Sequence, residues 1–203
     1  MTLEGKKIGF GITGSFCTVM EILEPLEMLR LAGADIYPVV SENVFRHSSR
    51  FHERDFLIDR LREISGKKAI STITEAETLG PDIPLDIMII APATGNTIAK
   101  LANGISDGPV LMAAKATLRN SKPVLLALFS NDALGANGVN IARLYNTKNI
   151  YFVPFGQDNP TAKPTSMTAD LLLLEDALEA ALQGKQVQPA IIAHGARTCK
   201  VDR

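Results

Sequence analysis

The sequence contains no tryptophan, and aromatic residues make up only 5% of its 203 positions. A surface that stacks nucleic-acid bases on several aromatic rings is therefore not expected. Its 21 basic and 22 acidic side chains nearly balance, and no basic block marks a DNA- or membrane-binding face. No apolar stretch approaches the roughly 18 residues of a membrane span, and no signal-peptide pattern precedes the first strand. We expect a cytoplasmic protein.

Cysteine and histidine are scarce as well. Cys17 and Cys199 lie far apart and form no CxxC pair, so we expect free thiols. His47 and His52 lack the i, i+4 spacing of metal ligands on one helical face, and His194 is remote from both. The sequence has neither a GxSxG nor a GxxxxGK(S/T) motif, so it indicates neither a serine hydrolase nor a P-loop enzyme.

Apolar residues are plentiful at 46%, and strand-like and helix-like segments alternate along the chain. This pattern predicts an α/β fold, a Rossmann/flavodoxin-like three-layer sandwich with a parallel sheet and helices on both faces. We expect a single domain over 1–203, with a core at about 6–155, a loop at 156–166, a C-terminal helix at 168–182 and a tail. Strands are predicted at 6–11, 35–40, 69–73, 85–91, 123–129 and 150–154, and helices at 16–31, 42–64, 96–102, 110–118 and 138–145.

Ligands of such sheets bind beyond the carboxyl ends of the strands, so the turns after the strands carry the functional signal. The first turn, Gly9–Ser15, reads GFGITGS and matches GxGxxG. Glycines let a backbone approach an anion, and a helix N-terminus offers free N–H groups. Glycines that serve only close helix–sheet packing are the alternative. After the second strand, Glu42 suits a dinucleotide ribose, whereas Ser41 suits a second phosphate contact better.

The turn after the fourth predicted strand begins the string PATGNTIAKLANGISD at Pro92. Its small residues leave room for a flat ring, and Asn96 or Thr97 can cap the helix that follows. The string resembles the PASANTIAKIANGIADNL signature of the flavin-dependent cysteine decarboxylase superfamily, and GITGS resembles that superfamily's GxTGSxA turn. These are homo-oligomeric FMN proteins. The resemblance implies FMN contacts at Gly14, Ser15, Ser41, Ala93, Thr94, Asn96 and Thr97.

Two departures from the superfamily bear on its chemistry. Its decarboxylases carry a histidine before the third strand-to-helix turn, where this chain has Lys68–Ile73 without one. Their substrate-binding Pro-x-Met-Asn motif is here Leu128–Asn131, which keeps Asn131 and places Ser130 before it. We expect Ser130 and Asn131 to contact substrate. Cysteine decarboxylation is not expected because it lacks its base, and no residue is predicted as a catalytic acid or base.

Length and tail resemble a sporulation branch of the superfamily. The resemblance implies an NADP-binding partner subunit, conversion of a dihydrodipicolinate-type precursor to the dicarboxylate dipicolinate, and a homo-oligomer (trimer or dodecamer) in the mother-cell cytoplasm. The pocket would hold FMN or be a remnant reshaped for substrate. The alternatives are a stand-alone FMN-dependent decarboxylase or prenyl-flavin transferase, a non-catalytic assembly subunit, and a plain NAD-binding domain. The loop at 156–166 is either a lid over the site or a linker.

Overall fold

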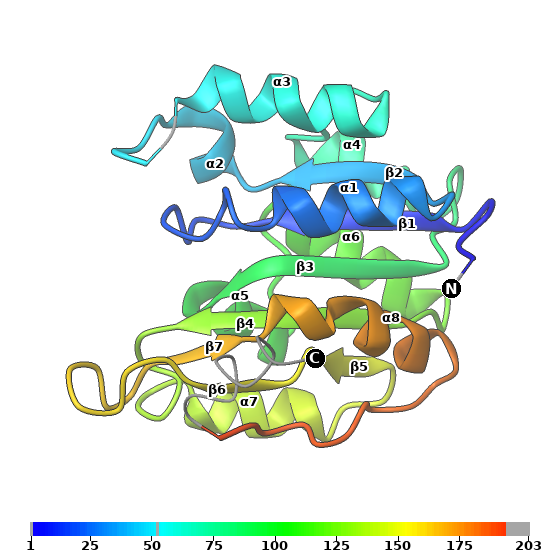
Figure 1. Cartoon of the computed structure of the whole chain (residues 1–203). Coiled ribbons are helices and arrows are strands. Elements are labelled where there is room, and N and C mark those ends of the chain that lie inside the picture. The colour runs from blue at the N-terminus through cyan, green and yellow to red at the C-terminus, as the bar shows by residue number, and fades with distance from the viewer. Residues whose placement is uncertain (1, 52, 194–203) are drawn as a thin grey trace.

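A twisted, mostly parallel sheet forms the centre of the computed structural model, which describes residues 2–51 and 53–193 (Figure 1). His52, His194 and Cys199 lie outside the described residues, and Cys17 is an exposed free thiol. The sheet order is β2-β1-β3-β4-β7-β6, and β5 also pairs with β4. β1, β2, β3, β4 and β5 pair in parallel, whereas β7 pairs antiparallel with β4 and β6. The strands are β1 (Lys7–Ile12), β2 (Asp35–Val40), β3 (Ile87–Thr94), β4 (Val124–Ser130), β5 (Ile150–Phe152), β6 (Phe155–Gln157) and β7 (Met167–Ala169).

Helices cover both faces of this sheet, which confirms the predicted three-layer α/β fold. In Figure 1, α1 (Leu23–Leu31) and α8 (Leu174–Leu182) lie in front of the strands. Behind them, α5 (Gly95–Ala102) and α6 (Pro109–Arg119) pack on the sheet, with α7 (Gly138–Tyr145) against α5 and α4 (Ile73–Glu77) against α6. The edge strand β2 leads into α2 (Glu42–Arg46) and α3 (Arg54–Ser65). No described helix has the length and apolar character that crossing a bilayer requires.

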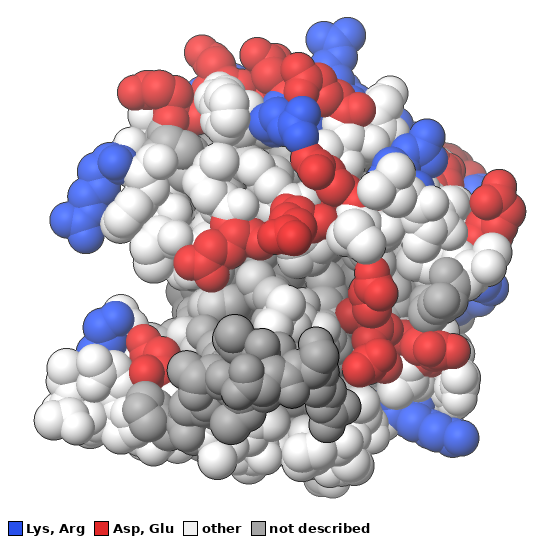
Figure 2. Space-filling view, in the orientation of Figure 1, with Lys and Arg blue, Asp and Glu red and all other residues white. Residues whose placement is uncertain are grey.

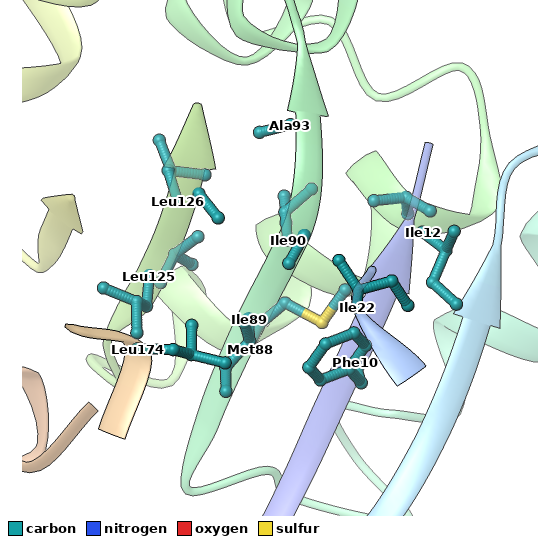
Figure 3. Packing of buried hydrophobic residues seen from close by; sticks show 14 of the residues in the cluster. Phe10, Ile12, Ile22, Met88, Ile89, Ile90, Ala93, Leu125, Leu126 and Leu174 are labelled. Carbon is teal, nitrogen blue, oxygen red and sulfur yellow. The ribbon is translucent and has the colours of Figure 1, made fainter. Parts of the chain in front are cut away.

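The core follows from the two longest apolar runs. Ile87–Ala91 and Val124–Leu128 are fully buried, as expected of parallel strands covered on both faces. Figure 3 shows side chains of β1, β3 and β4 meeting those of Ile22 and Leu174 in one cluster. Each fully buried Leu or Ile side chain contributes about 1.5–3 kcal/mol relative to exposure. Pro38 lies in β2, an edge strand, where the missing N–H of proline is tolerated.

The first helix begins later than predicted. α1 starts at Leu23, not at Phe16, and residues 16–22 form turns instead. Pro25 lies in the first turn of α1. Its missing N–H is tolerated there, but the helix cannot run back through it because the ring would clash with a carbonyl four residues earlier. The expectation that a helix begins at Phe16, directly after the Gly9–Ser15 turn, is therefore wrong.

The polar helix predicted over 42–64 is two helices, α2 and α3. Between them, the Ser48 hydroxyl accepts a hydrogen bond from the Arg54 N–H (3.0 Å) and donates one to the Glu53 carboxylate (2.8 Å). Such side-chain bonds compete with the helical ladder. Val44, Leu57 and Leu61 are buried, whereas Phe51 and Phe56 are about half exposed. The sequence pattern did not indicate the interruption.

The strand predicted over 69–73 is also absent from the described chain. Ile70 forms only an isolated bridge to Val39, and α4 begins at Ile73 inside what was predicted as strand and loop. Thr72 and Glu75 form a capping box: the Thr72 hydroxyl accepts the Glu75 N–H, and the Glu75 carboxylate accepts the Thr72 N–H. The T-x-x-E signature of this box marks a helix start and not a strand.

The predicted loop and C-terminal helix differ at their ends. Residues 155–157 and 167–169 pair as the antiparallel hairpin β6–β7, so the connecting loop is 158–166. The helix predicted from Thr168 begins as β7, passes through a short 3-10 turn (Leu171–Leu173) and becomes α8 at Leu174. The Asp170 carboxylate accepts the Leu172 N–H at 3.1 Å, which fixes the start of that turn.

Candidate functional site

The strand order places the site between β1 and β3. From β1 the chain continues to β2 on one side of it, while β3 lies on the other side. The boundary between β1 and β3 is therefore the topological switch point of the sheet. Thr13 directly follows β1. Its hydroxyl donates to the Pro92 carbonyl (2.7 Å) and accepts the Thr94 N–H (3.2 Å), and the residue is only 3% exposed. Thr13 therefore ties the two turns together. The GxGxxG pattern gives no signal for it, because Thr13 occupies a variable position.

Thr94 continues this connection into α5. It is the N-cap of that helix, and its hydroxyl accepts the Thr97 N–H (3.4 Å) and lies 2.9 Å from the Thr97 hydroxyl. Thr94 and Thr13 hydroxyl oxygens are 3.4 Å apart. The cap is thus Thr94, not Asn96 or Thr97 as the sequence indicated. Three neighbouring hydroxyl groups line up from the end of β1 to the first turn of α5.

A polar cavity of about 170 Å³ opens beside these hydroxyls. The structure brings three of the residues predicted to contact FMN, Ser41, Asn96 and Thr97, together in its wall. Gly14, Ser15, Ala93 and Thr94 are not part of this wall. The other lining residues are Thr13, Glu42, Asn43, Lys100, Asp107, Gly108, Pro109, Val110 and Leu111.

The electrostatics of this cavity favour an anion. Both α5 and α6 begin at it, and each helix N-terminus carries a partial positive charge and free N–H groups. The N-cap of α6 is Gly108, which has no capping side chain. Lys100 donates to both carboxylate oxygens of Asp107, at 2.7 and 3.0 Å, and this hydrogen bond lowers the pKa of Asp107. Asp107 thereby balances the lysine charge, and Glu42 adds a second carboxylate to the wall, so the positive potential comes from the two helix ends.

The three glycines of the first turn have different roles. A Cβ on Gly9 would lie 2.6 Å from the Met88 sulfur, and one on Gly11 would lie 2.7 Å from the Met88 methyl carbon. Both glycines therefore permit close packing on β3. A Cβ on Gly14 would meet nothing nearer than the Phe16 ring at 3.8 Å, so only Gly14 borders open space. Ser15 lies in the same turn, with its hydroxyl oxygen 3.2 Å from that of Thr18.

The end of β4 holds a second set of polar side chains. The buried Ser130 donates to the Asp132 carboxylate, and Asn137 donates to it at 2.9 Å. These groups pack against Gly95, where an added Cβ would lie 2.6–2.8 Å from all three side chains. The Ser130 hydroxyl predicted to meet substrate is therefore hydrogen-bonded within the fold. Asp132 was not singled out from the sequence, since nothing there signals its two partners.

Asn131 is held from the other side by the β6–β7 hairpin. Its side-chain oxygen accepts a hydrogen bond from Ser166 (3.3 Å), and its backbone carbonyl accepts one from Thr165 (2.6 Å). Its amide –NH₂ donates in no hydrogen bond within the described chain. Asn131 thus presents donors beyond the end of β4, where the sequence placed a substrate contact.

A second cavity of about 320 Å³ adjoins the first, and the two share Glu42 and the residues from Asp107 to Pro109. Its wall includes Arg46, Ser71, Thr72 and Thr74. This is where the 68–73 stretch reaches the site, and hydroxyl groups stand there with no histidine beside them. Arg46 also forms an exposed ion pair with Glu42 at 3.9 Å.

Comparisons with known proteins agree with this geometry. The sequence matches the Flavoprotein family over residues 1–182. It is 50% identical to the B subunit of dipicolinate synthase from Bacillus subtilis, over 94% of this chain and 96% of that protein. The crystal structure of the same B subunit from Bacillus halodurans superposes with a TM-score of 0.89 at 48% identity, covering 96% of this chain and all of that one. The FMN-dependent cysteine decarboxylase SpaF shares the fold, with a TM-score of 0.63 at 20% identity over 90% of this chain and 98% of its own.

Proposed function

Because the chain belongs to the Flavoprotein family, we propose that its relatives' activity is also its own: it is the B subunit of a dipicolinate synthase. The observation that carries the proposal is the 50% identity to such a B subunit, which extends along nearly the full length of both chains. In this role it acts with an NADP-binding partner subunit during sporulation, in the mother-cell cytoplasm. The pair converts a dihydrodipicolinate-type precursor to dipicolinate.

The residues present fit the phosphate end of FMN. Ser41, Asn96 and the first turns of α5 and α6 converge on one small polar cavity, and these are the neutral donors and helix ends that bind phosphate. Gly14 borders open space and leaves a ligand room to approach the first turn. Ala93 is fully buried and has no hydroxyl, so it adds no donor. When bound, FMN supplies a flat, redox-active ring system.

The chemistry assigned to this chain is binding and orientation. Aromatisation of the dihydro precursor would release a hydride and a proton. NADP⁺ on the partner subunit would supply the hydride acceptor, and solvent would take the proton. A dicarboxylate needs oriented donors, which are offered by the Asn131 amide and by Arg46, Thr72 and Thr74 in the second cavity. The hydroxyl-bearing wall at 71–74 has no histidine, which argues against stand-alone cysteine decarboxylation.

We also propose that the chain forms the homo-oligomer that the family resemblance implies. An apolar hollow of about 640 Å³ lies between α7, the β6–β7 hairpin and residues 188–191. Leu134, Tyr145 and Ile191 line it and are exposed. Exposed apolar side chains that gather in one hollow support contacts between protein chains.

The test is reconstitution with purified subunits. This chain and the NADP-binding subunit, separately and together, are assayed for dipicolinate by its ultraviolet absorbance and for NADPH formation. We expect product at the full rate only with both chains present. Equal activity from the partner alone would contradict the proposal. An absorbance spectrum of the freshly purified chain decides in parallel whether flavin is bound.

A further inference from the structure

An apolar groove with acidic margins lies on the face opposite α5 and α6, between α1 and the segment that leads into α8. Its cavity measures about 270 Å³. Pro25, Met28, Leu171 and Leu172 line it, and Met28 and Leu172 are 49% and 67% exposed. We call this surface the α1–α8 groove. Large apolar side chains left this open to water mark an interaction site more often than a free surface.

Three carboxylates border the same groove: Glu21 and Glu24 on the α1 side and Glu175 on the α8 side. Asp176 and Glu179 extend the acidic surface along α8, and Figure 2 shows acidic side chains gathered on this face. In the part of the chain that the structure describes, no ion pair or side-chain hydrogen bond involves Glu21, Glu24 or Glu175. The nearby Glu27 is different, because Arg60 pairs with it.

The carboxylates that border the groove do not form a metal-ion site. Within residues 2–51 and 53–193, no three acidic, histidine or cysteine side chains stand close enough together to hold one. The groove wall between the carboxylates is formed by methionine, proline and leucine, which are not ligands for a hard cation. Separated negative charges around an apolar strip match a partner that carries lysine or arginine on both sides of apolar side chains.

We propose that the α1–α8 groove is the docking surface for the NADP-binding subunit, which would present a basic amphipathic helix to it. The inference rests on the proposed function for the partner's identity. Charge complementarity carries it, together with the unpaired state of the three carboxylates and the exposure of Met28 and Leu172. The groove lies on the α1–α8 side of the sheet and shares no lining residue with the two polar cavities.

The test uses calorimetry at low and high salt to measure binding of the full chain to the purified NADP-binding subunit. The paired charge reversal Glu24→Lys and Glu175→Lys is expected to weaken binding by about tenfold or more and to flatten its salt dependence. Leu172→Asp is expected to weaken binding at both salt concentrations. All three residues are exposed, so the fold should persist. Glu77→Lys on α4 is the matched control, since Glu77 is exposed and lies on another face.

The outcomes separate the two proposals. If the wild-type chain fails to bind the NADP-binding subunit, the two-subunit function itself is overturned. If the wild type binds and the charge-reversed variant binds equally well, the function stands and the docking surface is wrong. Sedimentation of the chain alone supplies a further outcome. A charge reversal that dissociates the homo-oligomer without changing partner affinity assigns the groove to a second copy of this chain and overturns the inference.

Discussion

Replacing Thr13 with valine should uncouple the two turns that form the site. Valine keeps the side-chain shape but removes the hydroxyl that bonds the Pro92 carbonyl and the Thr94 N–H. Both backbone groups lie in a region where Thr13 is 3% exposed. An unsatisfied buried polar group costs about 1–3 kcal/mol, so the loss of both bonds should lower the unfolding free energy by about 2–6 kcal/mol. For a chain of this length, that lowers Tm by about 4–24 °C.

The matched control is Thr117→Val in α6. Thr117 is also fully buried, and its hydroxyl donates to the Ala113 carbonyl at 2.8 Å. That carbonyl keeps its helical hydrogen bond after the substitution, so the expected cost is below about 1 kcal/mol. Urea and thermal unfolding measure both variants. Equal stability of the two would refute the reasoning that Thr13 joins the two turns.

Three further predictions concern the same region and the rest of the fold. Gly95→Ala should lower the unfolding free energy by about 1–3 kcal/mol, because its Cβ would crowd Ser130, Asp132 and Asn137. Gly138→Ala, at the first position of α7, would add only an ordinary contact at 3.4 Å and should be nearly neutral in thermal unfolding. Asn96→Asp should leave stability unchanged, since an acidic residue suits the first turn of α5, but it should weaken binding of inorganic phosphate by about tenfold in calorimetry. Gln183→Glu makes the same charge change far from the cavity. An equal loss of phosphate binding in that variant would contradict the assignment. The hydrogen bond from the Ser71 N–H holds the pKa of Glu75 below its usual range. The ionised Glu75 therefore adds to the free energy of unfolding above about pH 4, and this stabilisation is lost as the pH falls through the lowered folded-state pKa. Glu75→Gln should therefore reduce the acid dependence of urea unfolding, and an unchanged pH profile would show that Glu75 is not responsible.

The buried strands were predictable because β3 and β4 are continuous apolar runs, which only a sheet covered on both faces explains. The site was predictable in part because these strands locate the carboxyl edge of the sheet. Once the carboxyl ends of the strands are located, Ser41, Asn96 and Thr97 must meet there. The long string beginning at Pro92 indicated the location and the start of a helix there. The structure also places the start of α6 at the cavity, which the sequence did not indicate.

What escaped prediction depends on contacts between distant residues. The GxGxxG pattern leaves Thr13 variable. The GxTGSxA turn has a threonine there, but only the bonds of Thr13 to Pro92 and Thr94, about eighty positions away, reveal its role. The strands β6 and β7 have three residues each, too few for a period to be read. The errors at the starts of α1 and α4 had local causes, since Pro25 and the Thr72–Glu75 box were visible in the sequence.

One edge of β4 is divided between two partners. Parallel β5 pairs with Val124–Leu126, and antiparallel β7 pairs with Phe129 and Ser130. A strand edge left open beyond Leu126 would offer unpaired backbone groups to other chains, and the hairpin closes it. The same hairpin holds Asn131 through Thr165 and Ser166. The hairpin therefore both protects the sheet from edge-to-edge aggregation and positions Asn131. A substitution that loosens the hairpin should reduce solubility and ligand binding together.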